Sequence, residues 1–262
     1  MLMLRGARRL GPSHSAPGSI REVLRHRSAS VARCVSSAQD SATTERNWRT
    51  KVVPALETFR QAFGHCIVDE EFEVPASAPW PTAVWGMPLG AIVRDIRAGN
   101  AYVGQAAHYE KQLQVLRFPW DHQAAVWSDR ILPALEAYAA ECGNGRVPFM
   151  FVVPSRDPWP RSAWGMNLGT TVASMRGMGS YFAYVGRDVD RLNELCYSLE
   201  MSTRVWRKCV CPLLEIHAER FGNDAPVRAD FVIPSEAPWP EEMWGVRLGA
   251  IVARNTRHLS SV

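Results

Sequence analysis

The chain has 262 residues, of which 47% are hydrophobic and 21% charged, a composition that is typical of a packed protein and excludes a wholly disordered one. No apolar run approaches the roughly 20 residues that cross a bilayer, so no membrane span is expected. The formal net charge is +4, but residues 1–40 hold seven arginines and two acids, which leaves 23 basic and 24 acidic residues elsewhere. Bulk charge therefore gives no support for nucleic-acid binding.

Residues 1–40 are rich in Arg and Ser and poor in acids. This composition is typical of a mitochondrial transit peptide, and the stretch 20–31 is compatible with a basic amphipathic helix. A secretory signal needs an apolar core of about 7–15 residues, which the arginines interrupt. We therefore predict a disordered leader over 1–40 and a location in the mitochondrial matrix. The alternative is a basic tail on a nuclear or cytoplasmic protein.

The rest of the chain repeats itself three times. Trp48, Trp127 and Trp206 lie 79 residues apart. Further on, three segments align without gaps: FEVPASAPWPTAVWGMPLG (72–90), FVVPSRDPWPRSAWGMNLG (151–169) and FVIPSEAPWPEEMWGVRLG (231–249). We predict a mainly α fold of three tandem helical repeats of about 79 residues. Their expected bounds are 46–121, 122–200 and 201–262.

Each repeat is expected to begin with an amphipathic helix. In the first repeat its apolar stripe is Trp48, Val52, Leu56, Phe59 and Phe63, with helical spacing. A proline six residues after the Trp is awkward there, so the helix either kinks or begins near it. Equivalent stripes follow in the other repeats and end at Cys142 and Phe221, so Cys142 is predicted to be a core residue.

A stiff, Trp/Pro-rich extended loop is expected between the first and second helices of every repeat, because proline fixes φ and disfavours helix before it. The second helix opens at a Leu-Gly pair. A third helix is expected around 109–116 and 189–195, and the third repeat is predicted to lack it.

These motifs resemble the helicase-associated domain family. The resemblance covers about residues 46–262 and depends on Leu89-Gly90 with Arg97, on Leu168-Gly169 with Arg176, and on QLQVLRFPWD (112–121). It implies small three-helix modules in tandem that bind nucleic acid. No phosphate loop of a helicase motor is present in the sequence.

Charge within the repeats points to the second helices. The windows 86–109, 165–187 and 245–262 hold seven arginines and one acid. We predict binding of DNA or RNA by phosphate contacts and base stacking. The predicted residues are Arg94, Arg97, Arg176, Arg254, Arg257, Trp80, Trp159 and Trp239. A solvated helix face and buried tryptophan anchors are the alternatives.

Other chemistry has little support in the sequence. There is no catalytic set, metal-ligand spacing or glycine-rich phosphate loop, so we expect no enzyme, cofactor, metal or small-molecule substrate. Glu57, Glu136 and Glu215 recur, and they are interpreted as a solvated face or as partners for an arginine of the next helix. The second hypothesis for function is a repeat scaffold that binds a protein partner through its Trp-rich loops.

Overall fold

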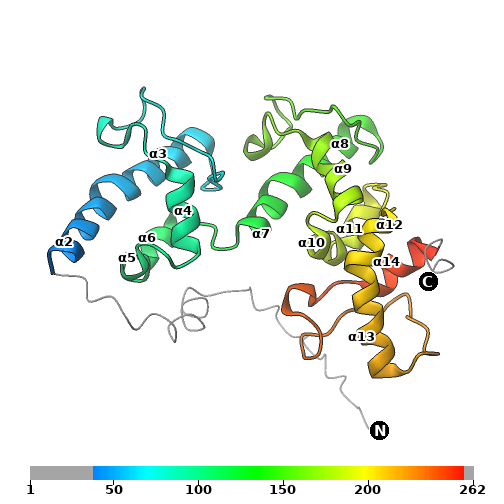
Figure 1. The fold of residues 1–262 in the computed structure, drawn as a ribbon. Coiled ribbons are helices and arrows are strands. Elements are labelled where there is room, and N and C mark those ends of the chain that lie inside the picture. Colours follow the sequence, from blue (N-terminus) through cyan, green and yellow to red (C-terminus); the bar gives the residue numbers. More distant parts are fainter. Residues whose placement is uncertain (1–37, 257–262) are drawn as a thin grey trace, which may run out of the picture. The chain divides into compact units, whose positions relative to one another are not determined.

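The computed structural model describes residues 38–256 and is mainly helical, with no strand in that range, which confirms the predicted class (Figure 1). None of the described helices is long and apolar enough to span a bilayer. Nearly all of the predicted leader, and Arg257, lie outside the described residues. The chain divides into two compact units: unit 1 takes the described residues up to 58 and 68–120, and unit 2 takes 59–67 and those from 121 onward.

Unit 1 holds the first helices of the chain. They are α2 (Ala38–Asn47), the π-helical turn η2 (Trp48–Val52), α3 (Val53–Phe63), the 3-10 turn η3 (Thr82–Val84), α4 (Leu89–Arg97), α5 (Val103–His108) and α6 (Glu110–Val115). The last residues of α3 belong to unit 2.

Unit 2 contains two successive sets of helices. The first set is α7 (His122–Val126), the π-helical turn η4 (Trp127–Ile131), α8 (Leu132–Cys142), the 3-10 turn η5 (Arg161–Ala163), α9 (Leu168–Met178), α10 (Phe182–Arg187) and α11 (Val189–Glu194). The second set is α12 (Thr203–Val205), the π-helical turn η6 (Trp206–Val210), α13 (Cys211–Phe221), the 3-10 turn η7 (Glu241–Met243) and α14 (Leu248–Arg254). One hydrophobic core runs through both sets.

Each first helix contains a π-helical turn just before its proline. The amide of Val53 donates to the carbonyl of Trp48, five residues back, and Leu132 and Cys211 make the same bond to Trp127 and Trp206. A proline follows directly in each case. Proline lacks an N–H and its ring collides with the carbonyl four residues earlier, and a wider turn relieves that collision. The helix therefore continues through the proline instead of beginning there.

The predicted stripe is buried except at its last position. Trp48, Val52, Leu56 and Phe59 are at most 4% exposed, whereas Phe63 is 43% exposed. Cys142 and Phe221 are exposed as well, so the prediction that Cys142 is a core residue is wrong. Each of the three is the final residue of its helix, and the glycine that follows has positive φ and turns the chain away.

The loop between first and second helices is held by a pair of backbone hydrogen bonds. In unit 1, the amide of Val74 donates to Met87 and the amide of Gly86 donates back to Val74, both at 2.9 Å. Val153 and Ile233 make the same pair of bonds in unit 2. These bonds fix the Pro-Trp-Pro turn against the rest of the unit, which buries the central tryptophan.

Candidate nucleic-acid interface

The N-terminus of each second helix is closed by the chain's own loop. The amide of Gly169 donates to the carbonyl of Phe151 at 3.0 Å, and a Cβ at Gly169 would lie 2.1 Å from the carbonyl oxygen of Pro148. Gly90 and Gly249 meet loop carbonyls in the same way, at 2.2 Å and 1.9 Å. These glycines therefore allow close packing of helix and loop.

Arg94 is occupied by carboxylates. Its guanidinium forms an ion pair with Glu70 at 2.5 Å and another with Asp95 at 3.1 Å, and its side chain is 52% exposed. The hydrogen bonds that Arg94 donates to Glu70 and Asp95 raise its pKa, so it stays charged. Exposed pairs of this kind are weak, but a phosphate would have to compete with two carboxylates already in place.

Arg97 and Arg176 occupy equivalent positions and lie over equivalent rings. The Cζ of Arg97 is 5.7 Å from the centre of the Phe118 ring, and its Nε donates to the carbonyl of Pro119 at 2.9 Å. The Cζ of Arg176 is 4.9 Å from the centre of the Tyr197 ring. Both side chains are half-buried, so their first role is to pack the end of the second helix against the segment that follows the third.

The four predicted arginines that the structure describes are divided between the two units. Arg94 and Arg97 belong to α4 of unit 1, while Arg176 and Arg254 belong to α9 and α14 of unit 2, and each engages different partners. Arg254 is exposed, and its Nη1 donates to the carbonyl of Ala250 at 3.2 Å.

The stacking role predicted for Trp80, Trp159 and Trp239 is wrong, because they are 7%, 2% and 3% exposed. Each ring packs against the phenylalanine that opens its loop. The tryptophans five residues later are the accessible ones: Trp85 is 44% exposed, and Trp164 is half-buried. The indole N–H of Trp85 donates to the carbonyl of Trp80 at 3.0 Å, so the exposed ring is held in one orientation.

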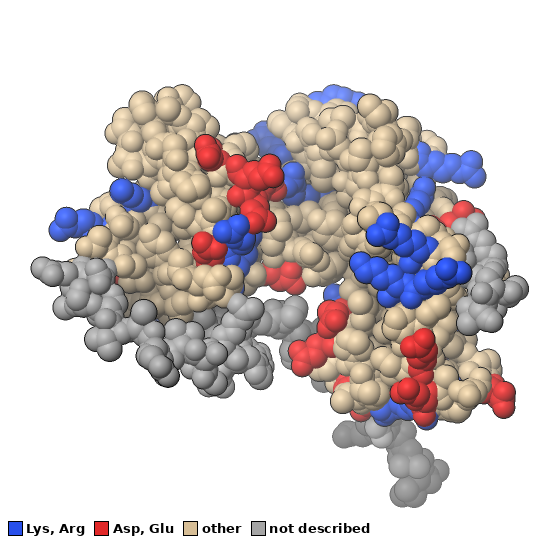
Figure 2. Space-filling model, in the orientation of Figure 1, with Lys and Arg blue, Asp and Glu red and all other residues tan. Residues whose placement is uncertain are grey.

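A basic cluster that the sequence reasoning missed lies at the start of the second set of helices in unit 2. Arg204, Arg207 and Lys208 are exposed, and at spacings of three and four residues they share one face of the helix formed by α12 and η6. No carboxylate in the described part of the chain forms an ion pair with them. Figure 2 shows basic side chains gathered in the region of α12 and α13. Counting charge along first helices as well as second ones would have found them.

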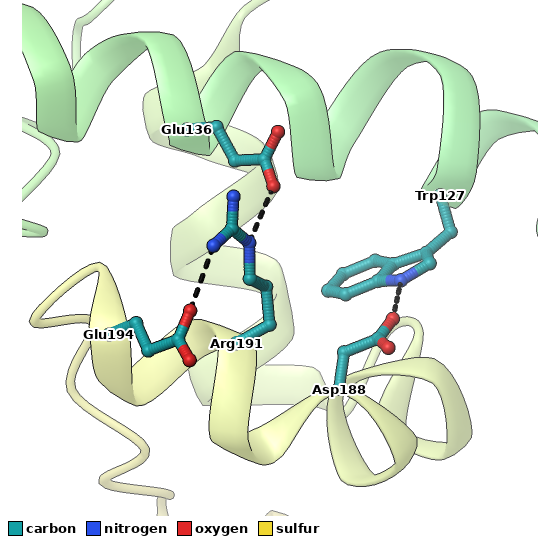
Figure 3. Close-up of polar contacts among 5 residues, drawn as sticks. All are labelled: Trp127, Glu136, Asp188, Arg191 and Glu194. Atoms are coloured by element: carbon teal, nitrogen blue, oxygen red, sulfur yellow. Dashed lines mark hydrogen bonds and ion pairs between the residues drawn. The ribbon is translucent and has the colours of Figure 1, made fainter.

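Two of the three recurrent glutamates, Glu57 and Glu136, connect helices, whereas Glu215 is exposed. Arg191 of α11 donates to Glu136 of α8 and to Glu194, both at 2.8 Å (Figure 3). Nearby, the indole N–H of Trp127 donates to Asp188 at 2.6 Å. In unit 1, Glu57 accepts from Gln112 at 3.3 Å. Glu136 and Glu57 therefore join the first helix of a set to its third helix.

Comparison with known proteins adds no relative: no family model, curated protein or solved structure matches the chain. Among the described residues, no group of three or more His, Cys, Asp or Glu side chains is arranged to hold a metal ion.

Proposed function

We propose that this protein binds nucleic acid, catalyses no reaction, and acts in the mitochondrial matrix. The observation that carries the proposal is the basic cluster formed by Arg204, Arg207 and Lys208. Three neighbouring cations that are exposed and have no carboxylate partner among residues 38–256 suit contacts to phosphate groups, which position a nucleic acid without reading its sequence. The paired arginines of α4 contribute less, because Glu70 and Asp95 already neutralise Arg94.

We also propose that the chain consists of three tandem helical repeats that resemble helicase-associated domains. The π-helical turns, the buried Pro-Trp-Pro tryptophans and the glycines against loop carbonyls, which recur at equivalent positions, support this organisation.

An inverted ion pair adds independent support. In the second repeat, Glu141 of α8 pairs with Arg156 of the loop. In the third repeat, Arg220 of α13 pairs with Glu236 of the loop at 2.5 Å, so the charges have exchanged places while the contact is kept. A shared architecture explains why both positions change together.

The test is a salt titration of binding to single- and double-stranded DNA and RNA by the full chain and by the variant Arg204→Gln/Arg207→Gln/Lys208→Gln. Each phosphate contact contributes about 0.7 to 0.9 to the slope of log K against log salt, so the variant should lower that slope by roughly 2 to 3.

A matched control removes three cations that form ion pairs, through Arg156→Gln, Arg220→Gln and Arg228→Gln. The control has the same net charge as the triple variant, and we expect its slope to change by less than 1. Failure to bind any of the four polymers at low salt, or equal slopes for the two variants, contradicts the proposal.

A protein-binding scaffold is the second candidate, and one surface favours it. Phe149, Met150 and Val152 are 61%, 81% and 47% exposed. The equivalent residues of the first repeat are the acids Glu70, Glu71 and Glu73. Exposed apolar side chains in a row are typical of contact surfaces. Phe149→Glu/Met150→Glu should abolish capture of a protein partner and leave nucleic-acid affinity unchanged if this surface is used.

A further inference from the structure

Exposed apolar side chains lie at both ends of α9. Phe149, Met150 and Val152 are exposed in the part of the preceding loop that packs on the start of the helix. The backbone of this segment closes the helix N-terminus, since an added Cβ at Gly169 would lie 2.2 Å from the carbonyl oxygen of Phe149. At the other end, Met178 is the last residue of the helix and is 50% exposed. Together these side chains expose roughly 400 Å² of apolar surface, and patches of this size mark contact sites.

The outward face of α9 between these two ends is small and uncharged. Ala173 and Ser174 are half-buried at its middle. The equivalent positions hold Arg94 and Asp95 in α4, and the second of them holds Arg254 in α14. The one charged residue of α9 is an arginine that packs over an aromatic ring. Of the three second helices, α9 is therefore the one without a charge at these two positions.

A face of this kind suits contact with a second copy of itself. In a two-fold dimer each helix crosses its own copy, so a charge at the middle of the face would meet the same charge. Small, uncharged residues avoid this repulsion and let two helices approach closely. An antiparallel crossing also sets the apolar start of one helix against the apolar end of the other. Each exposed apolar group then gains an apolar partner.

We propose that two copies of this chain pair through antiparallel α9 helices, with Met178 of each copy against the segment 149–152 of the other. The apolar side chains bury roughly 800 Å² over both copies, and the helix faces between them bring the contact to the lower end of the range for specific interfaces. A dissociation constant of about 1 to 100 μM is expected for such a contact. The inference goes beyond nucleic-acid binding and makes a second copy the partner of the surface that the scaffold candidate uses.

Sedimentation velocity of the full chain between about 1 and 200 μM measures this pairing. The buffer contains about 0.5 M salt, so that nucleic acid does not bridge the copies. It also contains a reductant, because Cys142 and Cys196 are exposed. We expect conversion from monomer to dimer within this range. A monomer at every concentration overturns the inference and leaves nucleic-acid binding, and capture of a different protein, standing.

Two valines provide a matched pair of variants. Val152 and Val232 occupy equivalent positions of their loops and are 47% and 44% exposed. Val152→Glu places a carboxylate in the contact of each copy, so it should weaken the dimer about tenfold per copy and about a hundredfold in total. Glu73 stands at the equivalent position of unit 1, so the loop accepts this side chain. Val232→Glu should leave association unchanged, and equal effects of the two variants overturn the inference.

A complementary pair of variants tests the antiparallel arrangement. Met178→Glu and Met150→Lys each place a charge against an apolar partner at both contacts of the dimer, so each variant alone should weaken association at least about tenfold. An equimolar mixture of the two should associate more tightly than either variant alone. In the mixed dimer, one contact joins opposite charges and the other keeps two methionines. A mixture that associates no better than the separate variants overturns the proposed pairing.

Discussion

Adding one methyl group at Gly169 tests how the second helix is seated on its loop. A Cβ there would lie 2.1 Å from the oxygen of Pro148 and 2.2 Å from the oxygen of Phe149, far inside the 3.0 Å below which such contacts essentially never occur. Both atoms belong to the backbone, so no side chain can rotate away. The loop must move by about 1 Å and stretch the hydrogen bond from Gly169 to Phe151. We expect Gly169→Ala to lower the free energy of unfolding by about 3 kcal/mol.

The matched control lies on the same helix. Gly177 has no atom within 4 Å of an added Cβ and has no positive φ. Gly177→Ala should therefore stabilise α9 by up to about 1 kcal/mol, the ordinary difference in helix propensity. The two variants make the same chemical change eight residues apart.

Urea unfolding followed by tryptophan fluorescence measures both effects. With a slope of about 2 kcal/mol per molar urea, Gly169→Ala should lower the midpoint by roughly 1.5 M, and Gly177→Ala should raise it slightly. A loss below about 1 kcal/mol for Gly169→Ala, or an equal loss for the two variants, would refute the close packing on which the reasoning depends.

Three further predictions concern other parts of the chain. Burial lowers the pKa of His217 below its usual 6.5, so the unfolded chain takes up a proton at a higher pH than the folded chain, and stability is lost as the pH falls below about 6.5. His217→Phe should reduce the change of the urea midpoint between pH 7 and pH 5. A change as large as that of the wild type would contradict this. Asp188→Ala leaves the indole N–H of buried Trp127 unpaired and should cost about 1–3 kcal/mol in urea unfolding, whereas Asp188→Asn, which keeps an acceptor, should cost less. Residues 1–40 fused to a fluorescent reporter should direct it to mitochondria, and a diffuse signal would remove the proposed location.

Periodicity in the sequence was sufficient to predict the helical class and most of the buried stripe. Trp48, Val52 and Leu56 lie at helical spacing on one face of their helix, and the structure buries that face. The predicted burial was wrong at Cys142, because the burial of a residue at a helix end depends on the direction that the chain takes after it. The π-helical turn was not predicted either, because a proline in the sequence does not determine the conformation of the helical turn before it.

The candidate site was harder to predict, because it depends on contacts between residues distant in sequence. Glu70 lies 24 residues from Arg94, and no local pattern shows that the two meet. The tryptophans show the same limit. Trp80 and Trp85 are five residues apart in one stiff loop, and only the fold decides that the first is buried and the second accessible.

The exchanged charges of the two helix-and-loop pairs in unit 2 limit how segments can be recombined. Moving the loop that follows α8 onto α13 would set Arg156 against Arg220, and the reverse transplant would set Glu236 against Glu141. Each loop is therefore matched to its own helix. A chimeric protein should tolerate exchange of a whole helix-and-loop block better than exchange of a loop alone.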